Sequence, residues 1–152
     1  TAGTEQQKGE TMNPKEYLLQ IKKCDNLINN KLAEIKSLKD LATSVTSAPK
    51  SDVIQSNGPQ DKVAITVGRI IDLEREIDED IDRFVALKRE IMRTIDQLDD
   101  AALIDLLYKR YFQYKKWEQI AVEMDYSFRQ VTRLHGQALQ ELKDVLKCPI
   151  DQ

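Results

Sequence analysis

An unbroken heptad pattern runs through the middle of this chain. Apolar residues recur alternately four and three positions apart over eleven positions, and only Glu74 and Lys88 interrupt them. The pattern comprises Val63, Val67, Ile70, Glu74, Ile77, Ile81, Phe84, Lys88, Ile91, Ile95 and Leu98. A seam of this length without a slip predicts a single long helix over about residues 61–98.

A shorter seam precedes it and begins at a helix-start signal. Asn13 can cap a helix, and Pro14 at the first helical position gives up an N–H group that would have no partner there. The seam then comprises Ile21, Cys24, Ile28, Lys31, Ile35, Leu38, Ala42 and Val45. We therefore expect a helix over about residues 13–45, followed by a loop, 46–60, that is rich in Ser, Pro, Asn and Gly.

The two seams can pair when the chain folds back across that loop. Antiparallel pairing sets Leu38 by Ile70 and brings Lys31 near Glu74 and Ile77, so the two mid-seam charges meet and help to define the register. Residues 13–98 are thus expected to form a coiled-coil hairpin. Its seam is expected to contain Ile28, Lys31, Ile35, Leu38, Ile70, Glu74, Ile77, Ile81 and Phe84.

Two helices cannot bury every apolar side chain of this hairpin. The residues expected beside the seams are Leu18, Leu27, Leu32, Ile71, Leu73 and Leu87. Because an apolar helix stripe has to be covered, we expect this half to self-associate into a dimer or tetramer.

The composition favours an all-α chain with one small domain and one extended element. Of its 152 residues, 32% are charged and only 6% aromatic, as is typical of long paired helices. Residues 1–12 are expected to be a disordered lead or a cloning remnant, and residues 148–152 a tail. No run of about 18 apolar residues predicts a membrane span, so a cytoplasmic location is expected.

Catalytic and metal chemistry are not expected. His135 is the only histidine, and the two cysteines, Cys24 and Cys148, lack metal-ligand spacing. The acidic run over residues 72–82 is interpreted as a solvated helical face. No Gly-rich phosphate loop is present in the sequence. We therefore expect no enzyme activity, no cofactor and no metal.

Residues 114–142 have the spacing of two short helices that meet at a tight turn. Trp117, Ile120, Ala121 and Met124 form one apolar stripe, which should end near Asp125. Ser127 is a good N-cap for the next helix. The second stripe comprises Val131, Leu134, Ala138, Leu139 and Leu142. Asp99 or Asp100 should cap a preceding helix that runs through Phe112, giving a helix-turn-helix domain over residues 99–147.

The polar side chains of this domain indicate double-stranded DNA as the partner. Between residues 108 and 143 seven Lys and Arg outnumber four Asp and Glu, a local net charge of +3 in a chain whose net charge is −3. Such a basic face suits phosphates. Predicted base-reading residues are Phe128, Arg129, Gln130 and Arg133. Predicted contacts to the DNA backbone come from Lys115, Lys116, Ser127, Thr132 and His135.

The same stretch resembles a known family. The shared residues are Leu106, Leu107, Arg110, Tyr111 and Phe112, then Trp117 to Ala121, Ser127, Val131, Leu134, Ala138, Leu139 and Leu142. Over about 40 residues they look like region 4 of sigma-70-type transcription factors. The resemblance implies a recognition helix that reads the major groove. Phe128 and Arg129 stand where sigma factors commonly carry Arg and Glu, so a different DNA sequence is expected.

The whole chain is similar to phage-encoded small regulators of the ArpU and RinA late-transcription type. The Trp117-Glu118-x-Ile120-Ala121 and Tyr126-Ser127 signatures and the loop at residues 56–62 carry this resemblance. It implies a sequence-specific transcription regulator in a bacterial host cell that assists or recruits host RNA polymerase. Two alternatives stay open. One is a small terminase-like DNA-packaging subunit, and the other is a module that binds polymerase or sigma without contacting DNA.

Overall fold

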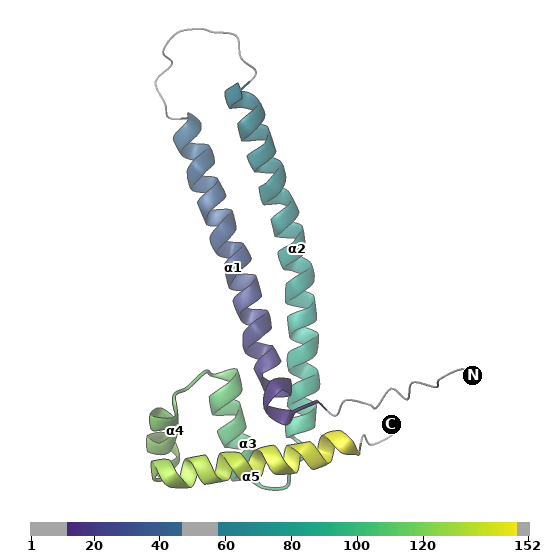
Figure 1. The fold of residues 1–152 in the computed structure, drawn as a ribbon, viewed down its shortest axis with the longest axis vertical. Coiled ribbons are helices and arrows are strands. Elements are labelled where there is room, and N and C mark those ends of the chain that lie inside the picture. The colour runs from purple at the N-terminus through teal and green to yellow at the C-terminus, as the bar shows by residue number, and fades with distance from the viewer. Residues whose placement is uncertain (1–11, 47–57, 149–152) are drawn as a thin grey trace, which may run out of the picture. The chain divides into compact units, whose positions relative to one another are not determined.

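The computed structural model describes residues 12–46 and 58–148, and all regular structure in these two ranges is helical (Figure 1). Helix α1 spans Pro14–Thr46 and helix α2 spans Gly58–Ile95, and the two form an antiparallel pair. Helices α3 (Ala101–Leu107), α4 (Trp117–Met124) and α5 (Phe128–Lys147) follow. Within these ranges no helix is both long and apolar enough to cross a membrane.

The helix boundaries follow local signals in part. The Asn13 side chain accepts a hydrogen bond from the Lys15 N–H at 2.9 Å, so the expected cap of α1 is present. Helix α2 was expected over residues 61–98, but it begins at Gly58 and ends at Ile95. Residues 47–57 of the expected loop lie outside the described ranges, as do residues 1–11 of the expected lead and 149–152 of the tail.

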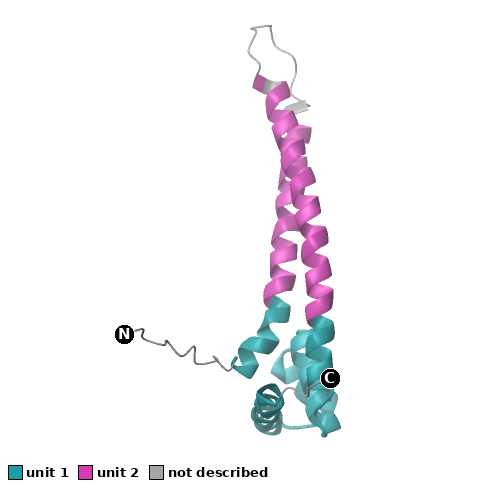
Figure 2. Cartoon of the chain, turned by 90° about the vertical axis from the view of Figure 1, so that its right-hand side faces the viewer, with its two compact units in different colours: residues 1–22, 88–152 teal, residues 23–87 magenta. Residues whose placement is uncertain are grey.

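The chain divides into two compact units (Figure 2). Unit 2 comprises residues 23–87, and unit 1 comprises residues 1–22 and 88–152. The sequence placed the boundary after residue 98. The first turns of α1 and the last turns of α2 instead belong to the same unit as α3, α4 and α5.

The core of unit 2 is the seam between α1 and α2. Ile28, Ile35, Ile70, Leu73 and Ile77 form one buried cluster, and Leu38 and Phe84 pack against it half-buried. On α1 the expected seam positions of this unit from residue 24 to residue 42 are buried or half-buried. On α2 the inward positions are residues 70, 73, 77, 80 and 84. These positions alternate three and four apart, as a heptad seam requires, but they are not the full set that the sequence pattern suggested.

Three of the expected seam residues on α2 are exposed, namely Val67, Glu74 and Ile81. The Glu74 side chain is 55% exposed and Ile81 is 41% exposed, whereas Leu73 is 2% exposed and Asp80 7%. The expected seam would have buried two charges, Glu74 and Lys88. In the structure Leu73 and Asp80 are buried in place of Glu74 and Ile81. Neighbouring residues of a helix point about 100° apart, so residues 73 and 80 lie on a different side of α2 from residues 74 and 81.

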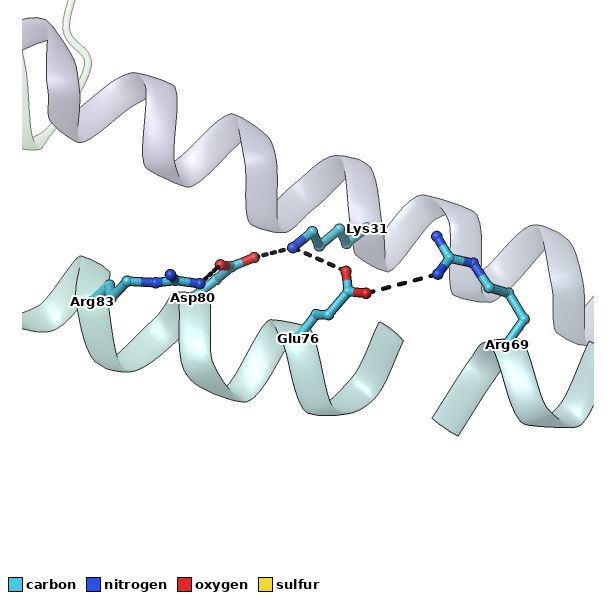
Figure 3. Close-up of polar contacts among 5 residues, drawn as sticks. All are labelled: Lys31, Arg69, Glu76, Asp80 and Arg83. Carbon is cyan, nitrogen blue, oxygen red and sulfur yellow. Dashed lines mark hydrogen bonds and ion pairs between the residues drawn. The ribbon is translucent and has the colours of Figure 1, made fainter. Parts of the chain in front are cut away.

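The buried carboxylate of Asp80 is paired across the hairpin (Figure 3). Lys31 of α1 lies 2.5 Å from Asp80 and 3.3 Å from Glu76. Arg83 binds the other oxygen of Asp80 at 2.6 Å, and Arg69 lies 3.7 Å from Glu76. Lys31 therefore lies beside the turn around Ile77, as the register predicted. Its expected partner was wrong, because Glu74 pairs with Lys39 at 3.6 Å instead.

This pairing is reflected in the ionisation of both groups. The hydrogen bond from Lys31, with a second one from Arg83, holds the pKa of Asp80 below its usual value. The same bond to Asp80, with help from Glu76, raises the pKa of Lys31. Both groups therefore stay charged where they meet. Removing only one of them would take away the nearest counter-charge of the other, and would leave Asp80 with Arg83 alone or Lys31 with Glu76 alone.

Unit 1 is built around α5, on which α3 and α4 pack. Its buried residues come from the first turns of α1, from the last turns of α2 and from all three shorter helices. They include Leu18, Ile21, Ile91, Ile95, Leu103, Leu106, Ile120, Val131, Ala138 and Leu142. Leu18, expected beside the seam, is fully buried in this unit. Tyr17 of α1 and Thr94 of α2 share a hydrogen bond of 3.0 Å, so the helix ends are joined by a polar contact as well.

Candidate nucleic-acid interface

The turn between α4 and α5 is rigid for local reasons. Asp125 adopts a left-handed conformation with φ 57°, and its N–H bonds back to carbonyl groups at the end of α4. Ser127 then caps α5, because its hydroxyl accepts a hydrogen bond from the Gln130 N–H at 3.2 Å. The Gln130 side chain returns the bond by accepting from the Ser127 N–H at 2.8 Å. This capping box confirms Ser127 as the N-cap of α5.

The first two turns of α5 present an exposed row of side chains. Phe128 is 51% exposed, and Arg129, Thr132 and Arg133 are exposed, whereas Val131 between them is fully buried. Arg129 and Arg133 are four residues apart and so share a face of the helix. Neither guanidinium forms an ion pair or hydrogen bond with any other residue that the structure describes. Two cationic forks are thus displayed without a partner inside these ranges.

Two of the expected DNA contacts are engaged within α5 itself. Gln130, expected to read a base, already accepts one hydrogen bond with its amide oxygen in the capping box, which restricts how its side chain can turn toward a base. The Thr132 hydroxyl donates to the carbonyl oxygens of Phe128 and Arg129, at 3.2 and 2.9 Å. At this end of α5, the hydrogen-bond donors that are free to bind a ligand are therefore mainly those of Arg129 and Arg133.

The two lysines before α4 differ in their surroundings. The Lys115 ammonium lies 2.7 and 2.8 Å from the two carboxylate oxygens of Glu123, and Lys109 approaches the same carboxylate at 3.5 Å. The bond from Lys115 holds the pKa of Glu123 below its usual value. Lys116 is exposed, and its ammonium forms no ion pair with a described residue. Lys116 is therefore the better placed of the two for a phosphate.

His135 does not join the exposed row, which corrects the expectation that it contacts the DNA backbone. Its Nε2 lies 2.8 Å from the Tyr111 hydroxyl, and its ring packs edge-on against Trp117 with centroids 4.5 Å apart. Burial, with the positive charges of Lys15 and Arg110, lowers the pKa of His135 to about 4. The imidazole is neutral at pH 7 and is held inside the unit.

A signal for this inward position was present in the sequence. His135 follows Val131 by four residues and precedes Leu139 by four, which places it on the buried stripe of α5. Tyr111 packs beside it, and burial raises the pKa of that phenol to about 12. Arg110 covers the Trp117 ring, with its guanidinium carbon 4.4 Å from the ring centroid. Sequence reasoning missed this cluster.

The segment that positions Lys116 and Trp117 is unusual in its backbone. Helix α3 is capped by Asp100, whose side chain accepts from the Ala102 N–H at 2.9 Å, and it runs on into a π-helical turn over Tyr108–Phe112. Arg110 then donates to the Lys115 carbonyl at 2.9 Å. Tyr114 takes a left-handed conformation with φ 54°. The chain thereby changes direction between α3 and α4, and Lys116 lies at the N-cap of α4.

The described residues of this region offer charged and polar groups that can bind a ligand. Among the described residues no group of three or more His, Cys, Asp or Glu could hold a metal ion. No known protein family, curated protein or solved structure matches the chain. The exposed row of α5 and its surroundings are therefore the structural features that point to a binding function.

Proposed function

We propose that this protein binds double-stranded DNA through the start of α5. The observation that carries the proposal is the pair Arg129 and Arg133, exposed on adjacent turns and unengaged by other described residues. A helix of this width fits the major groove, and an arginine fork can contact two acceptors of guanine at once. Phe128, half-exposed beside them, suits the methyl group of thymine.

The rigidity of the preceding turn supports the same proposal. A base contact is specific only if the side chain is delivered at a defined position, and the capping box defines where α5 begins. Lys116 is exposed at the start of α4, where its ammonium could meet a backbone phosphate. Glu123 is occupied by Lys115 and Lys109, so it offers less repulsion to an incoming phosphate than a free carboxylate would.

We further propose that this binding serves transcription. The resemblance to sigma region 4 and to small phage regulators supports a sequence-specific regulator that acts with host RNA polymerase. On this proposal the start of α5 recognises the DNA site, and self-association of the helical hairpin brings together the helix-turn-helix parts of two or more copies.

The proposal is tested by selecting bound sites from random duplex DNA and measuring affinity for the selected site and for unrelated DNA. Arg129→Ala and Arg133→Ala should each lower the discrimination between them by about 1 to 3 kcal/mol. The matched control is Arg75→Ala, which removes an exposed arginine of α2 in unit 2 and should leave both affinities unchanged. The proposal fails if no site is selected, or if the control weakens binding as much as the α5 variants do.

A second function is favoured by the apolar residues around the turn. Val122 is 81% exposed, and Tyr126 and Phe128 are also exposed. Exposed apolar residues at a tight turn suit a protein surface, so binding to polymerase or sigma without DNA is the alternative. A pull-down of polymerase from nuclease-treated extract separates the two functions. Capture of polymerase that is lost in Val122→Asp, together with no measurable affinity of the wild type for DNA, would favour the alternative.

A further inference from the structure

A second stripe of side chains runs along α2 beside the inward one. Each inward residue is followed directly by one member of this second stripe, and one residue corresponds to a rotation of about 100°. Its members are Val67, Ile71, Glu74, Asp78, Ile81 and Val85, all of which are exposed. Four of the six are apolar, and each of these four is roughly half-exposed. In an isolated hairpin this apolar surface would be in water.

On α1, the residues that directly follow the inward positions form a stripe that is mostly polar and basic. The residues that follow its inward positions are Asn29, Leu32, Lys36 and Lys39, all exposed. On two antiparallel right-handed helices, the residue after each inward position turns toward the same side of the pair, so these two stripes lie on one flank. The contact of 3.6 Å between Lys39 and Glu74 agrees with this. We call this surface, made of both stripes, the lateral flank of the hairpin. It lies entirely within unit 2.

The charges on the lateral flank are separated by helix. Helix α1 contributes the cations Lys36 and Lys39, and α2 contributes the anions Glu74 and Asp78. Lys36 and Asp78 form no ion pair with another residue that the structure describes. Since Lys31 lies level with residues 76–80 and Lys39 with Glu74, Lys36 is within about one helical turn of Asp78 along the hairpin.

We propose that two copies of this chain pair through the lateral flank, with α2 of each copy against α1 of the other. A twofold axis parallel to the helices produces this arrangement and leaves the height of each residue along the hairpin unchanged. Asp78 of each copy therefore lies opposite Lys36 of the other, and the dimer contains this contact twice. The apolar residues of the α2 stripe then pack near Leu32 and the aliphatic stems of the lysines. The product is a closed four-helix arrangement.

The charge pattern selects a second copy over an unrelated protein. A foreign partner would have to supply both a basic stripe for Glu74 and Asp78 and an acidic or apolar stripe for Lys36. This chain carries both stripes on one flank and at the same level, so it is complementary to itself. The alternative twofold, with α2 against α2, would instead place the α2 stripes together and leave Lys36 without an anion opposite it. The proposal does not depend on DNA binding.

The test is the mass of the full-length protein in solution by light scattering and sedimentation, at micromolar concentration. The wild type should be a dimer. Asp78→Lys and Lys36→Glu should each weaken the dimer by about tenfold or more, because each creates two like-charged contacts. The double variant with both changes restores the opposite charges, and its dissociation constant should return to within about threefold of wild type.

The control is Glu79→Lys, the same acid-to-lysine change one residue along α2 and off the lateral flank. It should leave the dimer intact. Asp78→Lys places a cation between Glu74 and Asp82 on α2, so the helix should be no less stable and circular dichroism should be unchanged. Ile71→Glu should give monomer, because it introduces a charge into the apolar part of the interface.

Several results would overturn the proposal. These are a monomeric wild type, an oligomer larger than a dimer, a Glu79→Lys variant that dissociates as readily as Asp78→Lys, or a double variant that does not recover. Recovery in the double variant is specific to the pairing of α1 with α2 of the other copy. Failure of DNA selection with a dimer that behaves as described would leave this proposal standing and overturn the other.

Discussion

The inward position of Leu73 rather than Glu74 can be tested by one substitution at each site. Leu73→Ala removes three carbon atoms from a side chain that is 2% exposed and packed with Ile70 and Ile77. At about 0.8 kcal/mol per buried methylene, the lost transfer free energy is about 2.4 kcal/mol. The cavity left between two helices adds to this unless they close on it, so the free energy of unfolding should fall by about 2.5 to 4 kcal/mol.

At a protein concentration low enough for the chain to be monomeric, Glu74→Ala should have almost no effect on the free energy of unfolding. The glutamate side chain is 55% exposed, and its pair with Lys39 at 3.6 Å involves a lysine that is 59% exposed. An ion pair of this kind contributes at most about 1 kcal/mol. Alanine also has the highest helix propensity, which offsets part of that loss. We therefore expect a change of less than about 0.5 kcal/mol in the free energy of unfolding.

The assay is urea unfolding followed by far-ultraviolet circular dichroism, with all proteins at one concentration because self-association makes stability concentration-dependent. The two midpoints are compared at equal slope, so that a change in midpoint reports stability alone. If Glu74→Ala destabilises the protein as much as Leu73→Ala does, the observed seam and the argument for it are refuted.

Three further predictions follow from unit 1. His135→Phe keeps an aromatic ring but cannot titrate. The wild-type imidazole has a folded pKa of about 4, below its unfolded value of 6.5. As pH falls from 6.5 to 4, the unfolded chain therefore takes up a proton that the folded chain does not, and stability is lost over this window. Over this window the free energy of unfolding of the variant should fall by about 2 kcal/mol less than that of the wild type, a difference reduced by the partial exposure of the ring. Parallel curves of stability against pH for the two proteins would contradict this. Asp125→Gly should match or exceed the wild-type melting temperature because of the left-handed backbone, while Asp125→Val should lose about 1 to 2 kcal/mol, so equal melting would be a refutation. Lys116→Ala should reduce the salt dependence of DNA binding by about one unit of slope and Lys115→Ala by less, because Lys115 is already paired with a carboxylate; equal reductions would count against that difference.

The local parts of this structure could be derived from sequence because their causes are local. Asn13, Asp100 and Ser127 cap helices in the manner expected of Asn, Asp and Ser. The buried face of α5 follows the spacing of Val131, Ala138 and Leu142. These features depend on side chains within about four residues of one another, and such interactions can be recognised without knowing the rest of the fold.

The candidate interface was predictable only in part. Arg129 and Arg133 are exposed as expected, because they lie away from the apolar stripe of α5. The roles of Lys115 and His135 were not predictable in the same way. Lys115 is neutralised by Glu123, eight residues away, and His135 is bound to Tyr111, 24 residues away. Both contacts depend on how α3, the π-helical turn, α4 and α5 pack together, which the residue types do not specify.

The sequence alone predicts two long helices and a set of short capped ones, because heptad spacing and capping residues act over one or two turns. It did not determine which way α2 faces. Two sets of residues on that helix have heptad spacing. They share positions 70, 77 and 84, but one set continues through 74 and 81 and the other through 73 and 80, which point about 100° away. Only the tertiary structure decided between them, since burying Leu73 and pairing Asp80 with Lys31 requires the other helix to be present.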